Sequence, residues 1–260
     1  MAEQPQTILA IERATDVLAL FADSAEQTLG VTEIAQALGL SKAVVYRILS
    51  SFRAKGFVEL DESTRRYSLG ERTLHLGLAY MNRLDVPRVA RPQLERLSSE
   101  TNETATLSLR TGWERVYVDQ VTPERDVMMM VQIGLRVPLH AGASSKAFLA
   151  FIDAEEQQEY LERPLDRLTK LTVTNAPRLR KELSDIRERG YAESFGERME
   201  GAGSVAAPIF GHDGKPAAVI SICGPVERFR DEADDAAKLL LDATTRLSRQ
   251  LGYRGGRAAG

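Results

Sequence analysis

Residues 31–56 read VTEIAQALGLSKAVVYRILSSFRAKG and predict two short helices joined by a tight turn. Thr32 is expected to cap the first helix, with Glu33 in its first turn, where the helix dipole favours an anion. Gly39 ends that helix because glycine tolerates left-handed backbone, and Ser41 caps the second one. The apolar positions of the second helix recur at the spacing of one buried face and are Val45, Ile48, Leu49 and Phe52. The pattern is that of a helix-turn-helix.

The opposite face of the second helix is small, polar and basic, and it carries Lys42, Ala43, Tyr46, Arg47 and Ser50. A helix with such a face can enter a major groove and reach phosphates and base edges. Together with Thr32 and Ser41, these residues form the predicted DNA-binding surface. A purely structural helix-turn-helix is the alternative interpretation of the same pattern.

The segment that follows favours DNA binding, because it predicts a basic β-hairpin, or wing. Apolar residues at 57–60 indicate one strand, 61–64 a turn, and Tyr67 and Leu69 the returning strand. Arg65 and Arg66 fall at the tip, where we expect them to meet phosphate. From Ser41 to Tyr67 there are six Lys or Arg against three Asp or Glu, a local excess that suits a phosphate backbone.

Composition limits the remaining possibilities. A length of 260 residues suggests two domains, and the net charge of −3 confines any DNA contact to one surface. The single cysteine excludes an intramolecular disulfide, and three scattered histidines give no zinc spacing, so no metal is expected. No Walker or dinucleotide motif occurs, and no cofactor is expected. The N-terminal MAEQPQ lacks signal-peptide features and no apolar run could span a bilayer, so we expect a soluble, cytoplasmic protein.

The fold class expected from the whole chain is α+β. A winged helix-turn-helix at 1–70, whose first helix at 7–22 packs Ile8 and Ile11 inward, precedes a linker helix at 71–85. A domain at 86–251 combines helices with an antiparallel sheet, and 252–260 is expected to be a disordered tail. Its strands are predicted at 104–110, 115–121, 127–133, 205–210 and 216–223, and its helices at 86–101, 144–153, 154–161, 176–190 and from Asp231 onward.

Several motifs in order make the chain resemble the IclR-type transcriptional regulators. They are TEIAQALGLSKAVVYRILSSF at 32–52, YSLGERTLHLG at 67–77, VPLHAGASSKAFLAF at 137–151 and GSVAAPIFGHDGKPAAVISICGP at 203–225. The resemblance covers roughly residues 7–251. It implies a GAF-like effector domain after the winged helix, dimers or dimer-derived tetramers, and control by a small organic acid or aromatic metabolite.

The resemblance also implies where an effector binds. The family's ligand-contacting segments correspond here to Ala143 and Ser144, to Ser194 and Ser204, and to Ser221 and Cys223. Some members have an acidic residue at position 194 and a serine at position 223, so the pocket of this chain is less polar.

The residues themselves also suggest a carboxylate site. Gly142-Ala143-Ser144-Ser145 precedes a predicted helix, whose free N–H groups attract anions, and a glycine loop precedes Ser204. Met128 and Val219 are expected to complete an apolar wall. A capped helix and a flexible loop without any ligand are the structural alternative.

An enzyme is the competing function. Ser144, Ser145 and Lys146 lie near His140 in sequence, as in a serine- and lysine-based hydrolase. However, no Ser-x-x-Lys spacing is present and no acid is placed to orient the histidine, so no catalytic residue is assigned. We therefore predict a homo-oligomeric repressor that binds an inverted-repeat operator. An activator is the alternative, since the sequence sets neither the sign of regulation nor the effector, the operator or the choice between dimer and tetramer.

Overall fold

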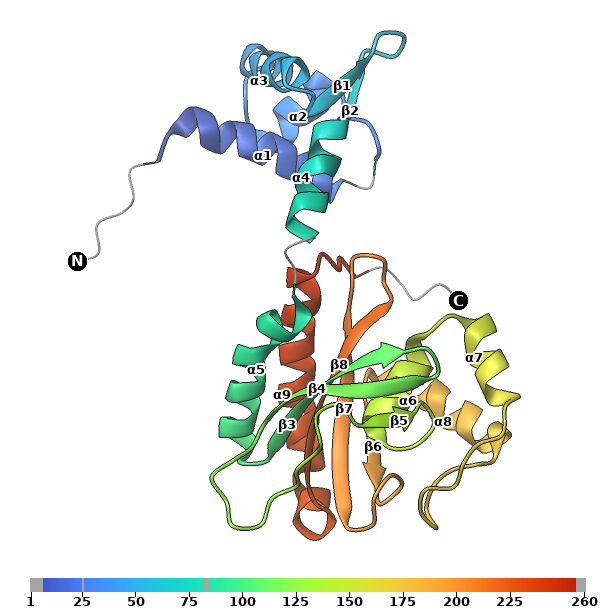
Figure 1. The fold of residues 1–260 in the computed structure, drawn as a ribbon. Helices are drawn as coiled ribbons and strands as arrows, with labels where there is room; N and C mark the ends of the chain where they lie inside the picture. The colour runs from blue at the N-terminus through green and yellow to red at the C-terminus, as the bar shows by residue number, and fades with distance from the viewer. Residues whose placement is uncertain (1–6, 25, 82–84, 256–260) are drawn as a thin grey trace, which may run out of the picture. The chain divides into compact units, whose positions relative to one another are not determined.

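The computed structural model describes residues 7–24, 26–81 and 85–255 of the chain. It divides into two compact units, residues 1–83 and 84–260, which are described separately (Figure 1). The division falls inside the segment predicted to be a linker. The α+β fold class predicted from the sequence is confirmed.

The first unit is a winged helix-turn-helix. Its core joins three helices to a hairpin and includes Val17, Ile34, Val45, Leu49 and Tyr67, all buried. The two strands of the hairpin pair in antiparallel fashion, with Leu60 opposite Tyr67. The elements are α1 (Leu9–Asp23), α2 (Val31–Leu38), α3 (Lys42–Ala54), β1 (Val58–Asp61), β2 (Arg66–Leu69) and α4 (Glu71–Met81).

The turn between α2 and α3 forms as its residues dictate, with one exception. Gly39 has a φ of +64° at the end of α2, and the Ser41 hydroxyl accepts a hydrogen bond from Val44 N at 3.4 Å. Thr32, however, does not cap α2. The helix starts two residues earlier than that cap requires, with Gly30 at the N-cap, and Glu33 Oε2 accepts from the Gly30 amide at 2.9 Å. A glutamate in the first turn can reach back to the amide before the helix, whereas Thr32 already lies within it.

Helix α1 is only half packed, which corrects the prediction that Ile8 and Ile11 face the core. Val17 and Phe21 are buried against the helix-turn-helix. Ile8 is 63% exposed and Ile11 is 58% exposed, because the N-terminal half of the helix extends past the small core. This half therefore leaves apolar side chains uncovered.

The second unit is built on a six-stranded antiparallel sheet in the order β5-β4-β3-β8-β7-β6. The strands are β3 (Thr104–Thr111), β4 (Glu114–Val121), β5 (Arg136–Pro138), β6 (Ala192–Phe195), β7 (Ala202–Phe210) and β8 (Pro216–Pro225). The strand predicted at 127–133 is wrong, because that segment is irregular and the edge of the sheet is formed by β5 instead. The short strand β6 was not predicted.

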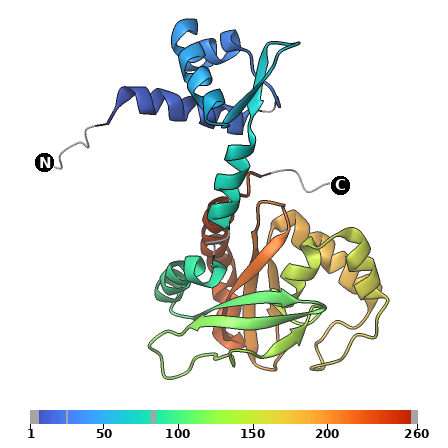
Figure 2. The same cartoon turned by 45° about the horizontal axis from the view of Figure 1, so that its top comes forward.

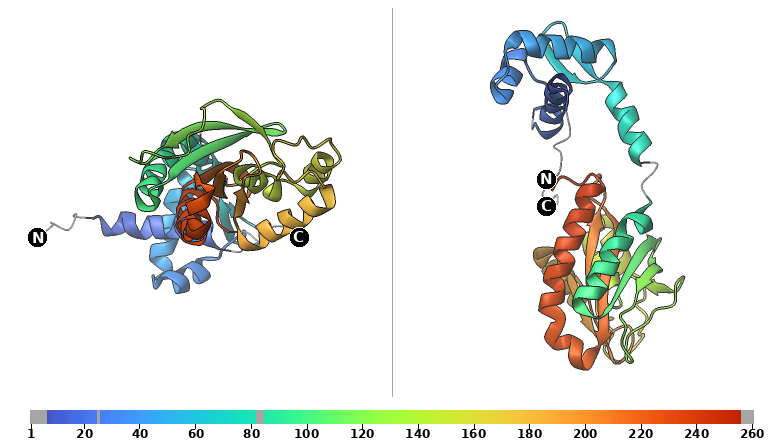
Figure 3. Two further views of the ribbon diagram at one scale, coloured as in Figure 1. Left: turned by 90° about the horizontal axis from the view of Figure 1, so that it is seen from below. Right: turned by 90° about the vertical axis from the view of Figure 1, so that its left-hand side faces the viewer.

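Helices cover both faces of this sheet. They are α5 (Val86–Thr101), α6 (Ala143–Phe151), α7 (Ala154–Leu161), α8 (Ala176–Arg189) and α9 (Val226–Gln250). α5 and α9 lie side by side on one face, and α6, α7 and α8 gather on the other (Figures 2 and 3). α9 starts at Val226, five residues before the predicted Asp231, directly after the strand ends at Pro225.

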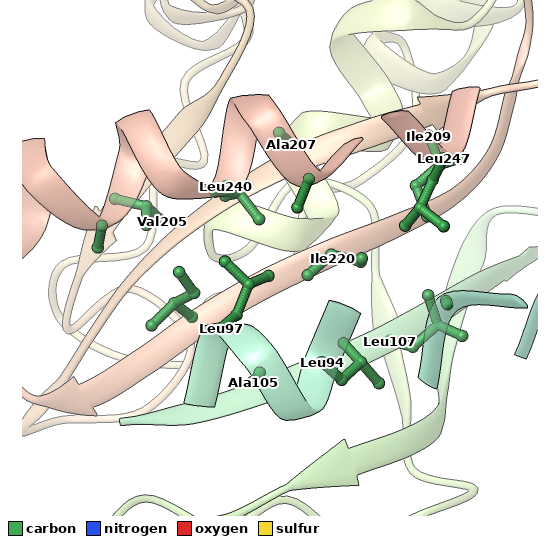
Figure 4. Close-up of a cluster of buried hydrophobic side chains, with 14 of the residues drawn as sticks. Leu94, Leu97, Ala105, Leu107, Val205, Ala207, Ile209, Ile220, Leu240 and Leu247 are labelled. Atoms are coloured by element: carbon green, nitrogen blue, oxygen red, sulfur yellow. The ribbon is translucent and has the colours of Figure 1, made fainter. Parts of the chain in front are cut away.

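The period of two along each strand divides the sheet residues between the two faces. Val205, Ala207 and Ile209 of β7 meet Leu240 and Leu247 of α9 in a wholly apolar layer (Figure 4). The alternate residues face α6 instead. One side of the sheet is therefore a conventional core, while the other is available for polar side chains.

The C-terminal segment is more ordered than expected. The ring of Tyr253 stacks on that of Phe210 with centroids 4.9 Å apart, and its amide donates to the Ser248 carbonyl at 2.9 Å. The prediction of a disordered tail from residue 252 is therefore wrong for 252–255. Residues 256–260 lie outside the described residues.

Candidate DNA interface and effector cavity

Helix α3 presents its predicted contact face to solvent. Val45 and Leu49 hold the helix in the core, so the positions between them point outward. The six exposed positions at the start and on this face are Ser41, Lys42, Ala43, Tyr46, Arg47 and Ser50. Such a row of side chains, from one helix and its cap, is the geometry that major-groove recognition requires.

The charges of the first unit separate into paired and unpaired groups. Arg53 of α3 and Arg65 of the wing both donate to Glu62, at 2.9 and 2.7 Å. Lys42 and Arg47 form no ion pair with any residue that the structure describes. Lys42 and Arg47 therefore leave positive charge on the exposed face of α3 that is available to a phosphate or a base edge.

Arg66 has a structural role, which corrects the prediction that it meets phosphate. Its two terminal nitrogens each donate to a Glu33 carboxylate oxygen at 2.9 Å, and its Nε donates to Thr28 Oγ1 at 2.9 Å. Arg66 thereby ties the wing to the start of α2. The Arg66 hydrogen bond, followed by that of the Gly30 amide, holds the pKa of Glu33 below its ordinary value. This guanidinium is already neutralised before any DNA approaches.

The remaining predicted residues of this surface converge on one groove. Thr32 at the start of α2, Tyr46 of α3 and Arg65 of the wing all line it. Thr32 thus belongs to the candidate interface even though it does not cap its helix.

In the second unit, six of the eight predicted effector residues line a single cavity. They come from the start of α6 and from three neighbouring strands, and they are Ala143, Ser144, Ser194, Ser204, Ser221 and Cys223. The cavity has a volume of about 20 Å³, which is room for about one water molecule. A ligand larger than water therefore requires the walls to move.

Strand register explains why these residues meet. Ser194 of β6 pairs with Ser204 of β7, which pairs with Cys223 of β8, so the three form one row across the sheet. Ser221 lies two residues from Cys223 on the same face, and its hydroxyl is 2.7 Å from that of Thr106. The face that is turned away from α9 is therefore rich in hydroxyls.

Two predicted residues do not line the cavity. Val219 faces the same side as Ser221 but is buried in the apolar cluster beneath α6. Met128 does not line the cavity, but its neighbour Met129 does, from the irregular segment after β4. Because this segment has no regular period, the sequence could not indicate which of the two adjacent methionines faces the cavity.

Sequence reasoning missed the basic part of the cavity. Arg115 and Tyr117 of β4 line it, together with Arg198 and Met199 from the turn between β6 and β7. Gly142 and Ala202 complete its lining. Arg115 and Tyr117 alternate along β4, so a shared face could have been anticipated, but the direction of that face depends on long-range pairing.

Arg115 is fully buried, at 1% exposure, and is held by neutral groups. Its Nε donates to Ser145 Oγ at 2.8 Å, and its other nitrogens donate to Ser108 Oγ at 3.0 Å and Tyr117 Oη at 2.9 Å. Burial lowers the pKa of Arg115, and the nearby positive charge of Arg198 acts in the same direction. The cavity therefore contains a desolvated cation before any ligand enters.

The groups considered for a hydrolase are engaged elsewhere. His140 Nδ1 lies 2.8 Å from the Tyr160 hydroxyl and Nε2 lies 2.8 Å from the Asp166 carbonyl, so both ring nitrogens are used. Lys146 Nζ donates to Glu197 at 2.6 Å and to Glu182 at 3.2 Å rather than activating a serine. Burial raises the pKa of the Cys223 thiol to about 12, which keeps it a neutral, weak nucleophile.

A winged helix with a cationic, exposed second helix, attached to a separate α+β unit with a small polar cavity, defines a class of protein: the DNA-binding transcriptional regulators. Within that class the chain belongs to the IclR family. Residues 10–62 match the IclR helix-turn-helix domain, and residues 78–249 match the family of bacterial transcriptional regulator IclR C-terminal domains. The chain is a transcriptional regulator and not an enzyme.

Individual relatives extend this match over nearly the whole chain. The HTH-type transcriptional regulator BhcR of Paracoccus denitrificans is 36% identical over 97% of this chain and 89% of its own length. The HTH-type transcriptional repressor AllR of Escherichia coli is 31% identical over 94% of this chain and 91% of its own length. A crystal structure of an IclR transcriptional regulator from Silicibacter sp. TM1040 covers 96% of this chain and 99% of that one, with 26% identity and a TM-score of 0.87.

Two kinds of feature are absent from the described residues. None of the helices in that part of the chain combines the length and apolar character needed to cross a membrane. No group of three or more His, Cys, Asp or Glu side chains is arranged there to hold a metal ion.

Proposed function

We propose that this regulator is a repressor that binds an inverted-repeat operator as a dimer or tetramer and responds to a small organic acid. The observation that carries the proposal is that cations without an ion pair in the described residues lie at two particular places: Lys42 and Arg47 on the exposed face of α3, and Arg115 and Arg198 in the cavity of the second unit. The first suits DNA and the second suits a small anion. Repression is favoured over activation because the relative AllR is a transcriptional repressor, and activation remains the alternative.

The proposed DNA contacts divide by role. Lys42, Tyr46 and Arg47 of α3 would enter the major groove, with Ser41, Ala43 and Ser50 beside them and Thr32 at the margin. Arg65 would approach the phosphate backbone by exchanging its exposed partner Glu62, an inexpensive step because surface ion pairs are weak. Arg66 is left out of this set because its guanidinium holds the wing in place.

Self-association is supported by uncovered apolar side chains in the first unit. Ile8, Leu9 and Ile11 of α1 and Leu74 and Leu76 of α4 are all more than half exposed. Exposed apolar side chains that gather into a patch commonly mark a protein interface. Two copies related by a twofold axis would present two α3 helices, which is why we expect the operator to be an inverted repeat.

The proposed effector site comprises Ala143 and Ser144 at the start of α6, with Ser194, Ser204, Ser221 and Cys223 of the sheet. The N–H groups of the first turn of α6 have no side-chain cap and favour an anion. Binding would change the operator affinity only if the effector prefers one arrangement of the regulator over another. The helix α4 and the segment after it would carry that coupling.

The test combines footprinting on the DNA adjoining the regulator's own gene with sedimentation of the full chain at micromolar concentration. We expect protection of two half-sites on one face of the duplex and a dimer or larger species. Loss of reporter expression on adding the regulator would support repression, and a gain would support activation. A monomer that protects a single half-site would contradict the proposal.

A further inference from the structure

Three charged side chains are almost fully buried among the residues described here, and they differ in how their charge is balanced. These are Glu103, Arg115 and Lys146, at 0%, 1% and 3% exposure. The Glu103 carboxylate accepts hydrogen bonds from Arg125 at 3.1 Å and from Arg228 at 3.0 Å. Lys146 forms ion pairs with both Glu182 and Glu197. Arg115 contacts only hydroxyls. Buried charges are normally paired, so this exception needs an explanation.

The cavity that Arg115 lines contains no acid to balance it. Neither aspartate nor glutamate appears among the described residues that form the walls. Glu103, whose charge also acts on Cys223, is already neutralised by its two arginines. The cavity lining therefore carries a positive charge that no acidic side chain in the lining balances.

A second guanidinium faces the same space. Arg198 lines the cavity and forms no ion pair in the described part of the chain. Its guanidinium carbon lies 5.8 Å from the centre of the Tyr117 ring, and that of Arg115 lies 4.3 Å from the same ring. Two cations against one aromatic ring repel each other, and an anion between or beside them would relieve that repulsion.

We infer that the effector is a compact organic dianion, with one carboxylate paired with Arg115 and the second held by Arg198. The inference rests on the proposed function and specifies the charge of its ligand. Arg115 would be the fixed partner, because hydroxyls of Ser108, Ser145 and Tyr117 position its fork before the ligand arrives. The α6 amides would add donors on the same side.

The positions of the two arginines suggest how the ligand enters. Arg115 is fully buried near the start of β4, whereas Arg198 is half-buried on the turn between β6 and β7. Arg198 packs against Gly142, where an added Cβ would lie 3.2 Å from Arg198 Cβ. A cavity of about 20 Å³ has to expand for any diacid, and movement of this turn with Arg198 and Met199 provides the space. Arg198 would then close over the second carboxylate.

The test uses the full chain and a series matched in shape. Oxalate, malonate and succinate are compared with their half-amides, which carry one charge, and with their diamides, which carry none, by calorimetry and thermal shift. We expect at least one diacid to bind about tenfold or more tightly than its half-amide, because the half-amide loses one charged hydrogen-bonded contact, and we expect the diamides not to bind. Binding of a diamide or half-amide as tightly as the diacid would overturn the inference, as would a failure of all three diacids to bind.

Single substitutions distinguish the role of Arg115 in ligand binding from that of Arg198. Arg115→Met should abolish binding of the diacid, and Arg115→Lys should restore part of it. Arg198→Gln should bind diacid and half-amide alike, because only the second charge has lost its partner. Arg110→Gln is the matched control: Arg110 pairs with Glu156 outside the cavity, and diacid binding should be unchanged. Unchanged diacid binding by a folded Arg115→Met protein would overturn the assignment.

Operator binding without ligand is measured in parallel, so that a failure of the dianion inference can be distinguished from a failure of the proposed regulatory function. If the operator is bound and is released by benzoate, a monoanion, but not by any diacid, the dianion inference is wrong and the regulator proposal stands. If the full chain binds no operator, the proposed function fails whatever the ligand series shows.

Discussion

Arg47 on α3 and Arg115 on β4 are both arginines without a carboxylate partner among the described residues, but Arg47 is exposed and Arg115 is buried. Water solvates the first charge, so leaving it unpaired costs little until phosphate replaces the water. The protein encloses the second charge, so its imbalance is built into the folded second unit. An unpaired cation on a surface thus suits a large polyanion, and one in a cavity suits a small anion.

The largest effects are expected from core substitutions that destabilise one unit and leave the other unchanged. Leu240→Ala removes a fully buried side chain between α9 and the sheet and should lower the free energy of unfolding of the second unit by about 2–5 kcal/mol. Leu49→Ala should act on the winged helix by a similar mechanism. Each variant should move one of two calorimetric transitions. If either variant shifts both transitions equally, the units do not behave as separate bodies and the comparison loses its basis.

The next effect sharpens the surface side of the comparison. Arg47→Ala should weaken operator binding by about 1–3 kcal/mol and relax sequence preference if the guanidinium reads a base edge. Arg53→Ala is the matched control on the same helix, because Arg53 is already paired with Glu62. Fluorescence anisotropy with operator and scrambled duplexes gives both affinities. Equal losses from the two variants would show that pairing within the protein does not determine which arginine contacts DNA.

A smaller effect concerns Arg66, whose role changed once its partners were known. Arg66→Met should lower the stability of the winged helix only slightly, since its pair with Glu33 is partly exposed and is weakened by solvent. The slope of operator affinity against salt should stay the same, because no phosphate contact is lost. A slope reduced by about one ion in the salt titration would return Arg66 to the DNA interface.

The smallest effect is the titration of the wing turn. Hydrogen bonds from Ser63 and then Thr64 lower the pKa of Asp61 to about 2 from its ordinary 3.8. Because the folded pKa is the lower one, the contribution of Asp61 is complete above about pH 4 and is lost as the pH falls through about 2. An NMR titration of the Ser63 amide should show its midpoint near pH 2. A midpoint at the ordinary value would mean that the turn is not held by this carboxylate.

The sequence predicted the winged helix well because its signals are local. Gly39, Ser41 and the spacing of Val45 and Leu49 act within one or two helical turns, and the exposed face of α3 follows from that spacing. Arg66 was misassigned because its partner Glu33 lies 33 positions away in sequence, across a pairing that no local pattern reveals.

The cavity was predicted only in part for the same reason. The family resemblance indicated Ser221 and Cys223 of β8 and the start of α6. Arg115, by contrast, meets Ser145 across 30 positions of sequence, and the irregular segment that carries Met129 has no period to follow. Local propensity could not show that a strand arginine would be buried without an acid.

The most direct test of the central claim, that the cavity senses the effector while α3 binds DNA, is operator release measured with Ala143→Leu. Ala143 is the first residue of α6 and lines the cavity, so leucine should fill it. Ala154→Leu, at the first residue of α7 and exposed, is the matched control. We expect Ala143→Leu to bind the operator with unchanged affinity and to resist release by the wild-type effector, while Ala154→Leu releases normally. Normal release by a folded Ala143→Leu protein would contradict the account.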